Sequence, residues 1–184
     1  SGKMSKSKGD FLTVSLLEKK GYNPMAYRLF CLQSHYRKNL VFTWENLDNA
    51  VVAYDKLIAK IASLKQDGEV DQSAFDQLKG RFVKALEGDL NTSVAVTAVY
   101  DVLKAKCNDA TKLAVIADFD KGLSLNLISA AEKLKKQQAE EAAASADPEI
   151  DALVAARTQA KKEKNYAEAD RIRDELKARG IEII

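Results

Sequence analysis

Residues 43–61 read TWENLDNAVVAYDKLIAKI, and this stretch decides the fold class. Its large apolar side chains recur three and four positions apart, at Trp44, Leu47, Val51, Tyr54, Ile58 and Ile61. That spacing is typical of a helix with one apolar face. Thr43 precedes it at the N-cap position, where a hydroxyl accepts hydrogen bonds from free backbone amides. The stretch therefore predicts a long amphipathic helix that packs within a larger helical core.

Further helices are predicted on both sides of residues 43–61. Their expected caps and breaks are, in chain order, Thr13, Gly21, Asn23-Pro24, Asp67-Gly68, Gly88, Asn91 or Thr92, Asp109 and Gly122. Such residues start helices through side-chain oxygens or end them through backbone freedom. Only eight Gly and two Pro occur in 184 residues, which disfavours a turn-rich β fold. The chain is therefore predicted to be mainly all-α, an antiparallel helical bundle.

The composition excludes several classes of protein and site. The formal net charge is only +2, so any contact with nucleic acid must come from local patches. Cys31 and Cys107 are far apart and form no CxxC pair, so we expect no disulfide framework, no metal site and a reducing, cytoplasmic compartment. No apolar stretch approaches ~20 residues and no apolar signal region opens the chain, so no membrane contact is expected.

The last part of the chain is predicted to form a separate small unit. Residues 135–146 are rich in Lys, Gln, Glu and Ala and indicate a linker or a solvated helical tail. Residues 147–184 are predicted to form an αα-hairpin that breaks at Asn165 and is followed by a short terminal strand at 181–184. A lone edge strand that ends in two isoleucines is incomplete, so we expect the natural chain to continue.

The predicted hairpin carries a local excess of basic residues, eight against five acidic ones between positions 157 and 179. The candidate RNA contacts are Arg157, Lys161, Lys162, Lys164, Tyr166, Asp170 and Arg173. Arg157, Lys161 and Lys164 share one helix face and form a stripe of the kind that follows a phosphate backbone. Tyr166 and Arg173 suit stacking on unpaired bases, and the Asp170 carboxylate suits the two edge donors of a guanine. The charges equally fit a solvated face with ion pairs along the helix, and Tyr166 equally fits the hairpin core.

The first residues carry the most informative motif, Lys3-Met4-Ser5-Lys6-Ser7. When a carboxylic acid is activated by ATP, negative charge builds on the departing phosphates. A flexible loop with compact ammonium groups closes over that charge and stabilises it. The serines add hydroxyl donors, and the methionine anchors the loop by burial. Taken alone, the pentapeptide is also compatible with a basic tail.

KMSKS is the signature loop of class I aminoacyl-tRNA synthetases, and the sequence around it resembles cysteine–tRNA ligases along the whole chain. The stretches that carry the resemblance are KMSKSKGDFL (3–12), SHYRKNL (34–40) with Phe42, ENL (45–47) with Ala50, GDLNTSVA (88–95), GLSL (122–125), and AKKEKNYAEADRIRDEL (160–176) at the centre of 157–180. Each stretch is a weak signal, but their order and spacing together are specific.

This resemblance implies roles for the motif and for the hairpin. Lys6 is implied to contact ATP, with Lys3 supporting it, as catalytic residues of the full enzyme. The implied partner is tRNA-Cys, whose anticodon GCA requires a guanine reader, and Lys161 aligns beside that anticodon. ATP with magnesium belongs to the full enzyme and zinc to its catalytic half, so no cofactor is expected in this chain. We expect a piece cut just upstream of KMSKS, a monomer that is inactive alone and binds tRNA and not DNA.

The resemblance also implies a domain order. The expected parts are a KMSKS loop (1–10), a connector like a stem-contact segment (11–42), a helical tRNA-binding bundle of the class I anticodon-binding type (43–134), a linker or helical tail (135–146) and a terminal anticodon-recognition hairpin (147–184). Two alternatives stay open. NYAEADRIRDEL (165–176) also resembles the protein-interaction hairpins of excision-repair proteins. Ligases that join cysteine to an amino sugar share the KMSKS half but read no anticodon.

Three further residues have structural interpretations. His35 has no acid near it in the sequence, so it is predicted to be a packed or hydrogen-bonded helix-end residue and not a catalytic one. Cys31 lies in an apolar run and Trp44 opens the apolar stripe of residues 43–61, so both are predicted to lie in the core.

Overall fold

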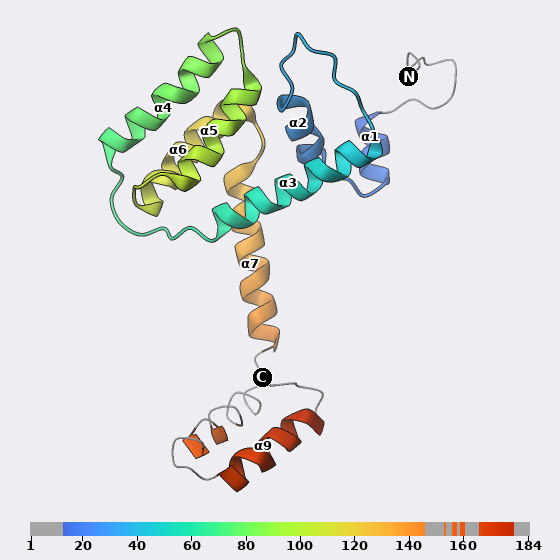
Figure 1. The fold of residues 1–184 in the computed structure, drawn as a ribbon, viewed down its shortest axis with the longest axis vertical. Helices are drawn as coiled ribbons and strands as arrows, with labels where there is room; N and C mark the ends of the chain where they lie inside the picture. The colour runs from blue at the N-terminus through green and yellow to red at the C-terminus, as the bar shows by residue number, and fades with distance from the viewer. Residues whose placement is uncertain (1–12, 146–152, 154–155, 158, 161–165, 179–184) are drawn as a thin grey trace. The chain divides into compact units, whose positions relative to one another are not determined.

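The computed structural model describes residues 13–145, 153, 156–157, 159–160 and 166–178 (Figure 1). Its helices are α1 (Val14–Lys19), α2 (Pro24–Leu32), α3 (Trp44–Ala62), α4 (Gln72–Glu87), α5 (Thr92–Lys104), α6 (Asp109–Leu123), α7 (Leu127–Ser145) and α9 (Tyr166–Ala178). Every regular element in the described ranges is a helix, which confirms the all-α prediction. The strand predicted at 181–184 lies outside these ranges. None of the described helices is long and apolar enough to cross a membrane.

The predicted helix caps are present, with one correction. Thr13, Asn23, Thr43 and Asn91 each accept a hydrogen bond from a backbone amide in the first turn of α1, α2, α3 and α5. The cap expected at Asp109 is wrong. Asn108 caps α6 instead, since its Oδ1 accepts from the Thr111 amide at 2.9 Å. Asp109 then lies in the first turn, where a negative charge interacts favourably with the helix dipole.

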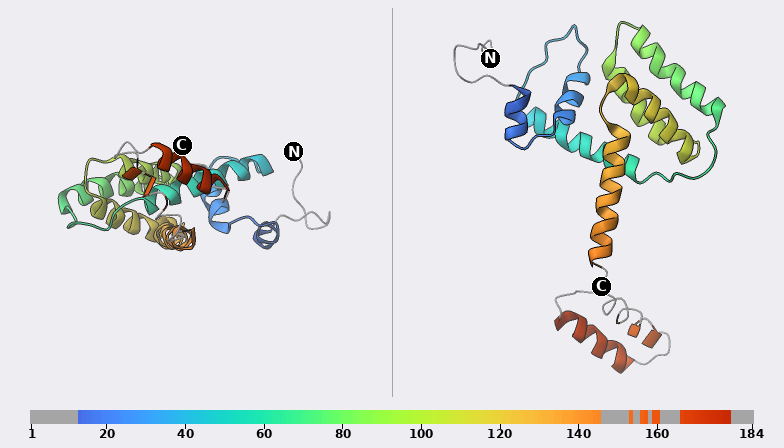
Figure 2. Two further views of the ribbon diagram at one scale, coloured as in Figure 1. Left: turned by 90° about the horizontal axis from the view of Figure 1, so that it is seen from below. Right: turned by 180° about the vertical axis from the view of Figure 1, so that it is seen from behind.

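Contacts between Cα atoms divide the chain into two compact units, Ser1–Lys135 and Lys136–Ile184. In the first unit α2 packs on α3, while α4, α5 and α6 lie side by side, as Figure 1 and the right-hand view of Figure 2 both show. Phe82 of α4 and Phe119 of α6 stack between their helices, with ring centroids 4.1 Å apart. Both side chains are buried, so the stack is part of the core.

Helix α3 buries a face slightly rotated from the predicted stripe. Its buried residues are Leu47, Ala50, Tyr54, Leu57, Ile58 and Ile61. Trp44, predicted to lie in the core, is 39 % exposed at the start of the helix, where it stacks on Tyr22 and meets the edge of Phe42. The prediction failed because the stripe was extended to the first helical residue, which lies at the edge of the packed region.

The connection between α6 and α7 is held by one carboxylate. Asp120 accepts hydrogen bonds from the backbone amides of Leu125 and Leu127, both at 2.7 Å. The break predicted at Gly122 occurs two residues later, because α6 continues through Gly122 and ends at Leu123. Ser124 follows in the left-handed conformation, with φ 51°. The backbone carbonyls of this turn accept hydrogen bonds from other segments. Arg28 Nε of α2, for example, donates to Leu123 O at 2.6 Å.

The second unit contains α9 and the described residues before it. Ala169, Ile172 and Leu176 are buried along one face of α9, and Ala160 is buried in the preceding segment. Their spacing of three and four places them on a single side of the helix. Helix α9 therefore has an apolar side for packing within its own unit and a polar side for solvent or a ligand.

Candidate nucleic-acid interface

The polar side of α9 is covered by ion pairs between neighbouring turns. Arg173 lies 2.9 Å from Asp170 Oδ1 and donates to Asp174 Oδ1 at 3.0 and 3.1 Å. Arg171 donates to both oxygens of Glu168, at 2.7 and 3.1 Å. The hydrogen bond to Asp174, then the charges of Asp174 and Asp170, raise the pKa of Arg173 above its ordinary value. The guanidinium is thereby held as a fixed cation between two acids.

This arrangement brings together two of the residues predicted to touch RNA, Asp170 and Arg173. The two side chains keep 64 % and 48 % of their surface exposed. Exposed ion pairs of this kind contribute little to stability, so an incoming base or phosphate replaces them at small cost. A carboxylate that accepts and a planar guanidinium that donates and stacks then face the same ligand.

The other predicted contacts are placed less fully. Lys161, Lys162 and Lys164 lie outside the described residues, as do the five residues of the KMSKS motif. Tyr166 is the first residue of α9, and its side chain is not among those described. Arg157 is half-buried, and among the residues that the structure describes its buried Nε has no hydrogen-bond partner.

A second polar cluster was not predicted, and it lies in the first unit. Asp89, in the turn between α4 and α5, accepts from the Tyr36 hydroxyl at 2.6 Å and from Arg37 Nη2 at 3.0 Å, and Arg37 Nε lies 2.9 Å from its other oxygen in an ion pair. His35 Nε2 lies 3.7 Å from the same carboxylate. We call His35, Tyr36, Arg37 and Asp89 the Asp89 cluster. The view of His35 as a residue without a nearby acid is therefore wrong, because Asp89 is distant in sequence and adjacent in space.

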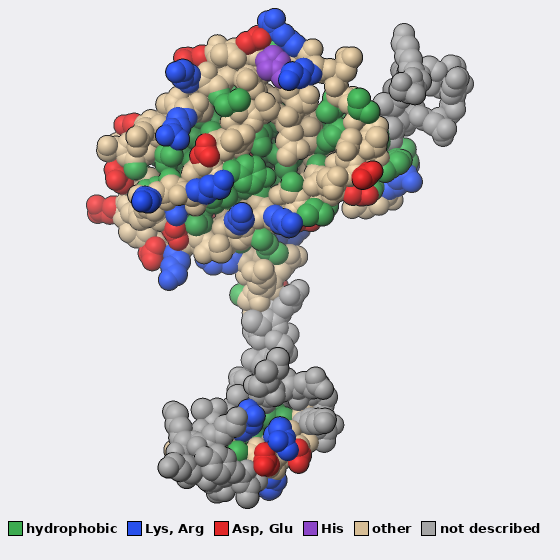
Figure 3. All heavy atoms as spheres, viewed as in Figure 1, with side chains coloured by type: hydrophobic (Ala, Val, Ile, Leu, Met, Phe, Trp, Pro, Cys, Tyr) green, Lys and Arg blue, Asp and Glu red, His purple; other side chains and the backbone are tan. Residues whose placement is uncertain are grey.

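Within the Asp89 cluster two aromatic rings are stacked, His35 half-buried and Tyr36 exposed. The His35 and Tyr36 ring centroids are 4.9 Å apart with an interplanar angle of 23°. The Arg37 guanidinium lies 5.5 Å from the Tyr36 ring centroid and donates from Nε to the Tyr36 hydroxyl at 3.0 Å. Tyr36 is nevertheless 61 % exposed. Basic side chains gather beside the histidine in Figure 3, where the segment after α2 meets the α4–α5 turn.

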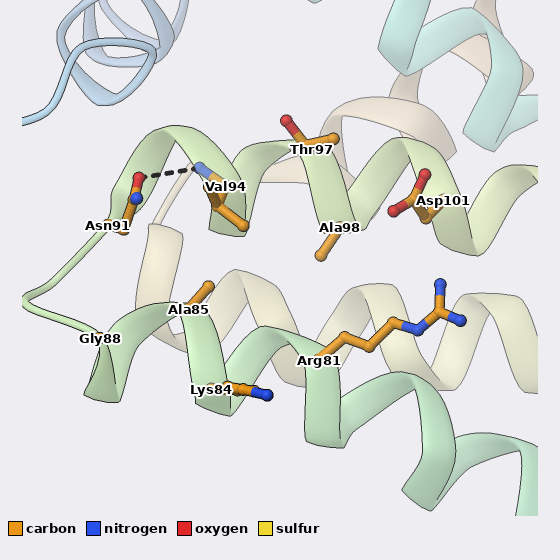
Figure 4. A pocket seen from close by; sticks show the side chains of 9 residues that line it. All are labelled: Arg81, Lys84, Ala85, Gly88, Asn91, Val94, Thr97, Ala98 and Asp101. Atoms are coloured by element: carbon orange, nitrogen blue, oxygen red, sulfur yellow. Dashed lines mark hydrogen bonds between the residues drawn. The ribbon is translucent and has the colours of Figure 1, made fainter.

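A groove between α4 and α5 begins at the same turn (Figure 4). Ala85 of α4 and Ala98 of α5 point into it from opposite sides, and its polar lining consists of Arg81, Lys84, Asn91, Thr97 and Asp101. We call this feature the α4–α5 groove. Arg81 points its guanidinium toward the α5 side below Asp101, and no ion pair joins the two. Elsewhere on the face of the first unit in Figure 3, basic and acidic side chains are interspersed, as the small net charge leads one to expect.

Known proteins match the chain in two ways. The family model described as the cysteinyl-tRNA ligase anticodon binding domain matches residues 143–183, which include α9. A cysteine–tRNA ligase of Novosphingobium aromaticivorans is 40 % identical over 194 residues, covering 100 % of this chain and 38 % of that protein. One of Caldicellulosiruptor saccharolyticus is 38 % identical over 196 residues, covering 99 % of the chain and 41 % of that protein.

A third relative, cysteine–tRNA ligase 1 of Burkholderia lata, is 35 % identical over 178 residues, covering 97 % of the chain and 35 % of that protein. The chain therefore spans about two fifths of the length of these relatives, and the part that it matches is their C-terminal region.

Proposed function

Because this chain belongs to the cysteine–tRNA ligase family and matches the C-terminal part of its members, we propose that it binds tRNA-Cys on the anticodon side for a cysteine–tRNA ligase. The observation that carries this proposal is the pairing of two matches. The whole chain aligns with enzymes of that name, and the family's anticodon-binding domain covers residues 143–183. The helical bundle of residues 43–134 would hold the body of the tRNA while the terminal hairpin contacts the anticodon.

The charges of the hairpin support this division of roles. Four basic residues and one acidic residue lie between positions 157 and 165, whereas three basic and four acidic residues lie in α9. The first segment, with Arg157, Lys161, Lys162 and Lys164, would follow the phosphate backbone. Helix α9 would provide the polar groups that meet base edges, with the Asp170 carboxylate accepting from the guanine of GCA and Tyr166 or Arg173 stacking.

The chemistry of aminoacylation is proposed for the full-length protein. In it, Lys6 with Lys3 of the KMSKS motif would stabilise charge on the phosphates of ATP, and Met4, Ser5 and Ser7 would support the loop. ATP with magnesium is proposed for the full enzyme, and zinc for its catalytic half, which this chain does not cover. No group of three or more His, Cys, Asp or Glu side chains in the described ranges has the arrangement to hold a metal ion. We further propose that the protein acts as a monomer in the cytoplasm.

Fluorescence anisotropy with a labelled tRNA-Cys transcript tests the proposal. The chain is expected to bind with an affinity that falls steeply with salt, and to bind a transcript with a replaced anticodon at least about tenfold more weakly. Lys161→Ala is expected to weaken both complexes and to lower the salt dependence. Asp170→Asn is expected to reduce the preference for the GCA anticodon.

Asp174→Asn is the matched control, since Asp174 has the same residue type, lies on the same helix and binds the same Arg173 as Asp170. It removes the same charge one turn away and should leave the anticodon preference intact. Equal affinity of the unaltered chain for both transcripts, or no binding at low salt, would contradict the anticodon-reading role.

A further inference from the structure

The boundary between the two units falls inside a helix. The first unit ends at Lys135 and the second begins at Lys136, whereas α7 is one helix from Leu127 to Ser145 (Figure 1). The side chains from Lys135 to Glu140 are all exposed, so this stretch is held by its helical hydrogen bonds and not by packing. Lys136 and Glu140, one turn apart, form an ion pair at 3.8 Å. A helical stretch of this kind is a semi-rigid spacer, so the direction of α7 is set where the helix begins.

The start of α7 is fixed by a carboxylate from the preceding helix. Asp120 of α6 accepts from the Leu125 amide with Oδ1 and from the Leu127 amide with Oδ2, each at 2.7 Å. Leu127 is the first residue of α7, so Asp120 takes the role that an N-cap side chain has in other helices. Its negative charge also lies at the end of α7 where it interacts favourably with the helix dipole. Two charge-assisted hydrogen bonds thereby bind α6 to the start of α7.

Two other helices hold the carbonyls of the same turn. The buried Tyr54 hydroxyl of α3 donates to Leu125 O at 2.8 Å, and Arg28 Nε of α2 donates to Leu123 O at 2.6 Å. Leu125 is therefore bound through its amide to α6 and through its carbonyl to α3. The side chains of Leu123, Leu125 and Leu127 all lie in the buried core of the first unit. The first turn of α7 cannot pivot without breaking these hydrogen bonds or moving a leucine out of the core.

The backbone of this turn depends on the contacts that hold it. Ser124 and Asn126 have φ angles of 51° and 56°, both in the left-handed region that non-glycine residues rarely adopt. Both residues are exposed, so packing of their own side chains does not impose this conformation. Such backbone persists only where the surrounding structure holds it, and here the Asp120 carboxylate binds the amide that follows each of the two residues. Removal of the carboxylate is therefore expected to release the turn to other conformations and α7 to other directions.

We propose that Asp120 is a positioning residue for anticodon reading, because it fixes the direction in which α7 leaves the first unit toward the hairpin. When a stiff connector joins two contacts on one tRNA, the second contact forms only at a set place. Hydrogen bonds to base edges are short and directional, whereas attraction between a lysine and a phosphate acts over longer distances. A loosened α7 therefore reduces base reading more than overall affinity. This role rests on the anticodon-binding function proposed above and adds to it a residue that touches no RNA.

The first test is Asp120→Asn, measured as the ratio of affinities for the tRNA-Cys transcript and a transcript with a replaced anticodon. An asparagine has one side-chain acceptor oxygen, so its NH2 group would face one of the two backbone amides that Asp120 binds. The ratio is expected to fall by about three- to tenfold. Asp120→Glu keeps both oxygens and the charge and should recover part of the ratio. Measurements are made at a temperature where melting curves show each variant to be folded.

Asp118→Asn is the matched control for this test. Asp118 lies on the same helix, and its carboxylate pairs with the side chains of Lys79 and Lys121 at 2.9 and 3.1 Å. Both variants make the chain more positive by one charge, so a purely electrostatic effect strengthens the binding of both transcripts alike and leaves their ratio unchanged. Asp118→Asn should show only that effect. An unchanged ratio in Asp120→Asn, or equal falls in both variants, would overturn the specificity role of Asp120.

The second test measures the direction of α7 without RNA. Spin labels at Lys56 of α3 and Gln138 of α7, both exposed, report the distance between these helices in a chain whose Cys31 and Cys107 are replaced by alanine. The chain that keeps Asp120 should give a narrow distance distribution. Asp120→Asn should broaden or displace the distribution, and Asp118→Asn should not.

The two tests together separate the role of Asp120 from the function on which it rests. An unchanged distance distribution in Asp120→Asn would overturn the positioning role, whatever the RNA measurement gives. A ratio near one for the unaltered chain, together with a broadened distribution in Asp120→Asn, would contradict anticodon reading and support the placing of α7 by Asp120. A high ratio that Asp120→Asn leaves unchanged would overturn the link between α7 and specificity and leave anticodon reading intact.

Discussion

The Tyr36 hydroxyl donates a hydrogen bond to Asp89 Oδ1 at 2.6 Å, across 53 positions of sequence. With the Arg37 contacts to the same carboxylate, it attaches the segment after α2 to the α4–α5 turn. That segment has no regular structure between α2 and α3, and its other end is held separately, by packing of Phe42 against Phe30 and Trp44. The attachment of residues 35–38 to the α4–α5 turn should therefore depend on one exposed acid.

Asp89→Ala is expected to loosen residues 35–38 with little effect on global stability, about 1 kcal/mol or less. The reason is that the carboxylate accepts from two side chains of this segment, Tyr36 and Arg37. Hydrogen exchange should show faster exchange of the Lys38 amide, which donates to His35 O at 2.8 Å, and unchanged protection in α3. Asp67→Ala, at an exposed aspartate of the α3–α4 loop, is the control and should leave residues 35–38 unchanged. Equal exchange in both variants would contradict the anchoring role.

Tyr54→Phe should destabilise the first unit by about 1–2 kcal/mol, because it leaves a buried carbonyl without its donor. Tyr54 is 2 % exposed, and its hydroxyl donates to Leu125 O at 2.8 Å. Urea unfolding measures the change. Tyr100→Phe is a matched control at a half-buried tyrosine and should cost less. A cost for Tyr54→Phe no larger than that for Tyr100→Phe would show that the bond contributes nothing specific.

In the folded protein the Tyr54 hydroxyl should lose its proton at a higher pH than an ordinary tyrosine does. Burial, then the charges of Asp120 and Asp55, raise its pKa from 10.0 to about 12. A raised pKa means that its contribution to stability is complete below pH 10 and is lost as the pH rises toward 12. The unaltered protein should therefore lose stability relative to Tyr54→Phe over that window. Unfolding curves of both proteins at several alkaline pH values check this, and parallel curves throughout would contradict it.

Asp118→Asn should destabilise the protein at neutral pH and have no effect in strong acid. Hydrogen bonds from Lys79 and Lys121 hold the pKa of Asp118 below its ordinary 3.8. Because the folded-state pKa is the lower one, the stabilisation is present above pH 3.8 and is lost as the pH falls further. Melting temperatures from pH 7 to pH 2 should thus converge for the two proteins. A constant difference would assign the effect to packing and not to charge.

Leu176→Ala should unfold the second unit while leaving the first intact. Leu176 is fully buried at 0 % exposure, and large-to-small changes at such sites cost about 2–5 kcal/mol. A unit of this size has little stability to lose. Hydrogen exchange should show loss of protection in α9, with the helices of the first unit still protected. Leu90→Ala, at a side chain that is 61 % exposed, is the control and should leave both units protected. Simultaneous loss in both units would contradict their independence.

Local signals in the sequence were sufficient for most of the helices. Thr13, Asn23, Thr43 and Asn91 cap helices because each needs only amides within three residues of itself. The Asp109 cap was predicted wrongly because Asn108 and Asp109 are adjacent and both suit the position. The exposed Trp44 was also predicted wrongly, since periodicity gives the face of a helix and not the point along it where packing begins.

Of the candidate interface, the sequence indicated the segment and its chemical character. The excess of basic residues in the hairpin and its resemblance to cysteine–tRNA ligases are visible without coordinates, and the match at residues 143–183 agrees with them. The ion pair between Asp170 and Arg173 also follows from the sequence, because an i,i+3 spacing places both residues on one side of α9.

What only the tertiary structure decided is which distant segments meet. Asp89 joins His35, Tyr36 and Arg37, and Tyr54 of α3 donates to Leu125 O in the α6–α7 connection, through contacts between groups far apart in the sequence. The physical reason is that helix formation depends on hydrogen bonds and side chains a few residues apart, which the sequence lists directly. Contacts between helices depend on how their apolar faces pack, and that packing brought Arg37 beside the turn that carries Asp89.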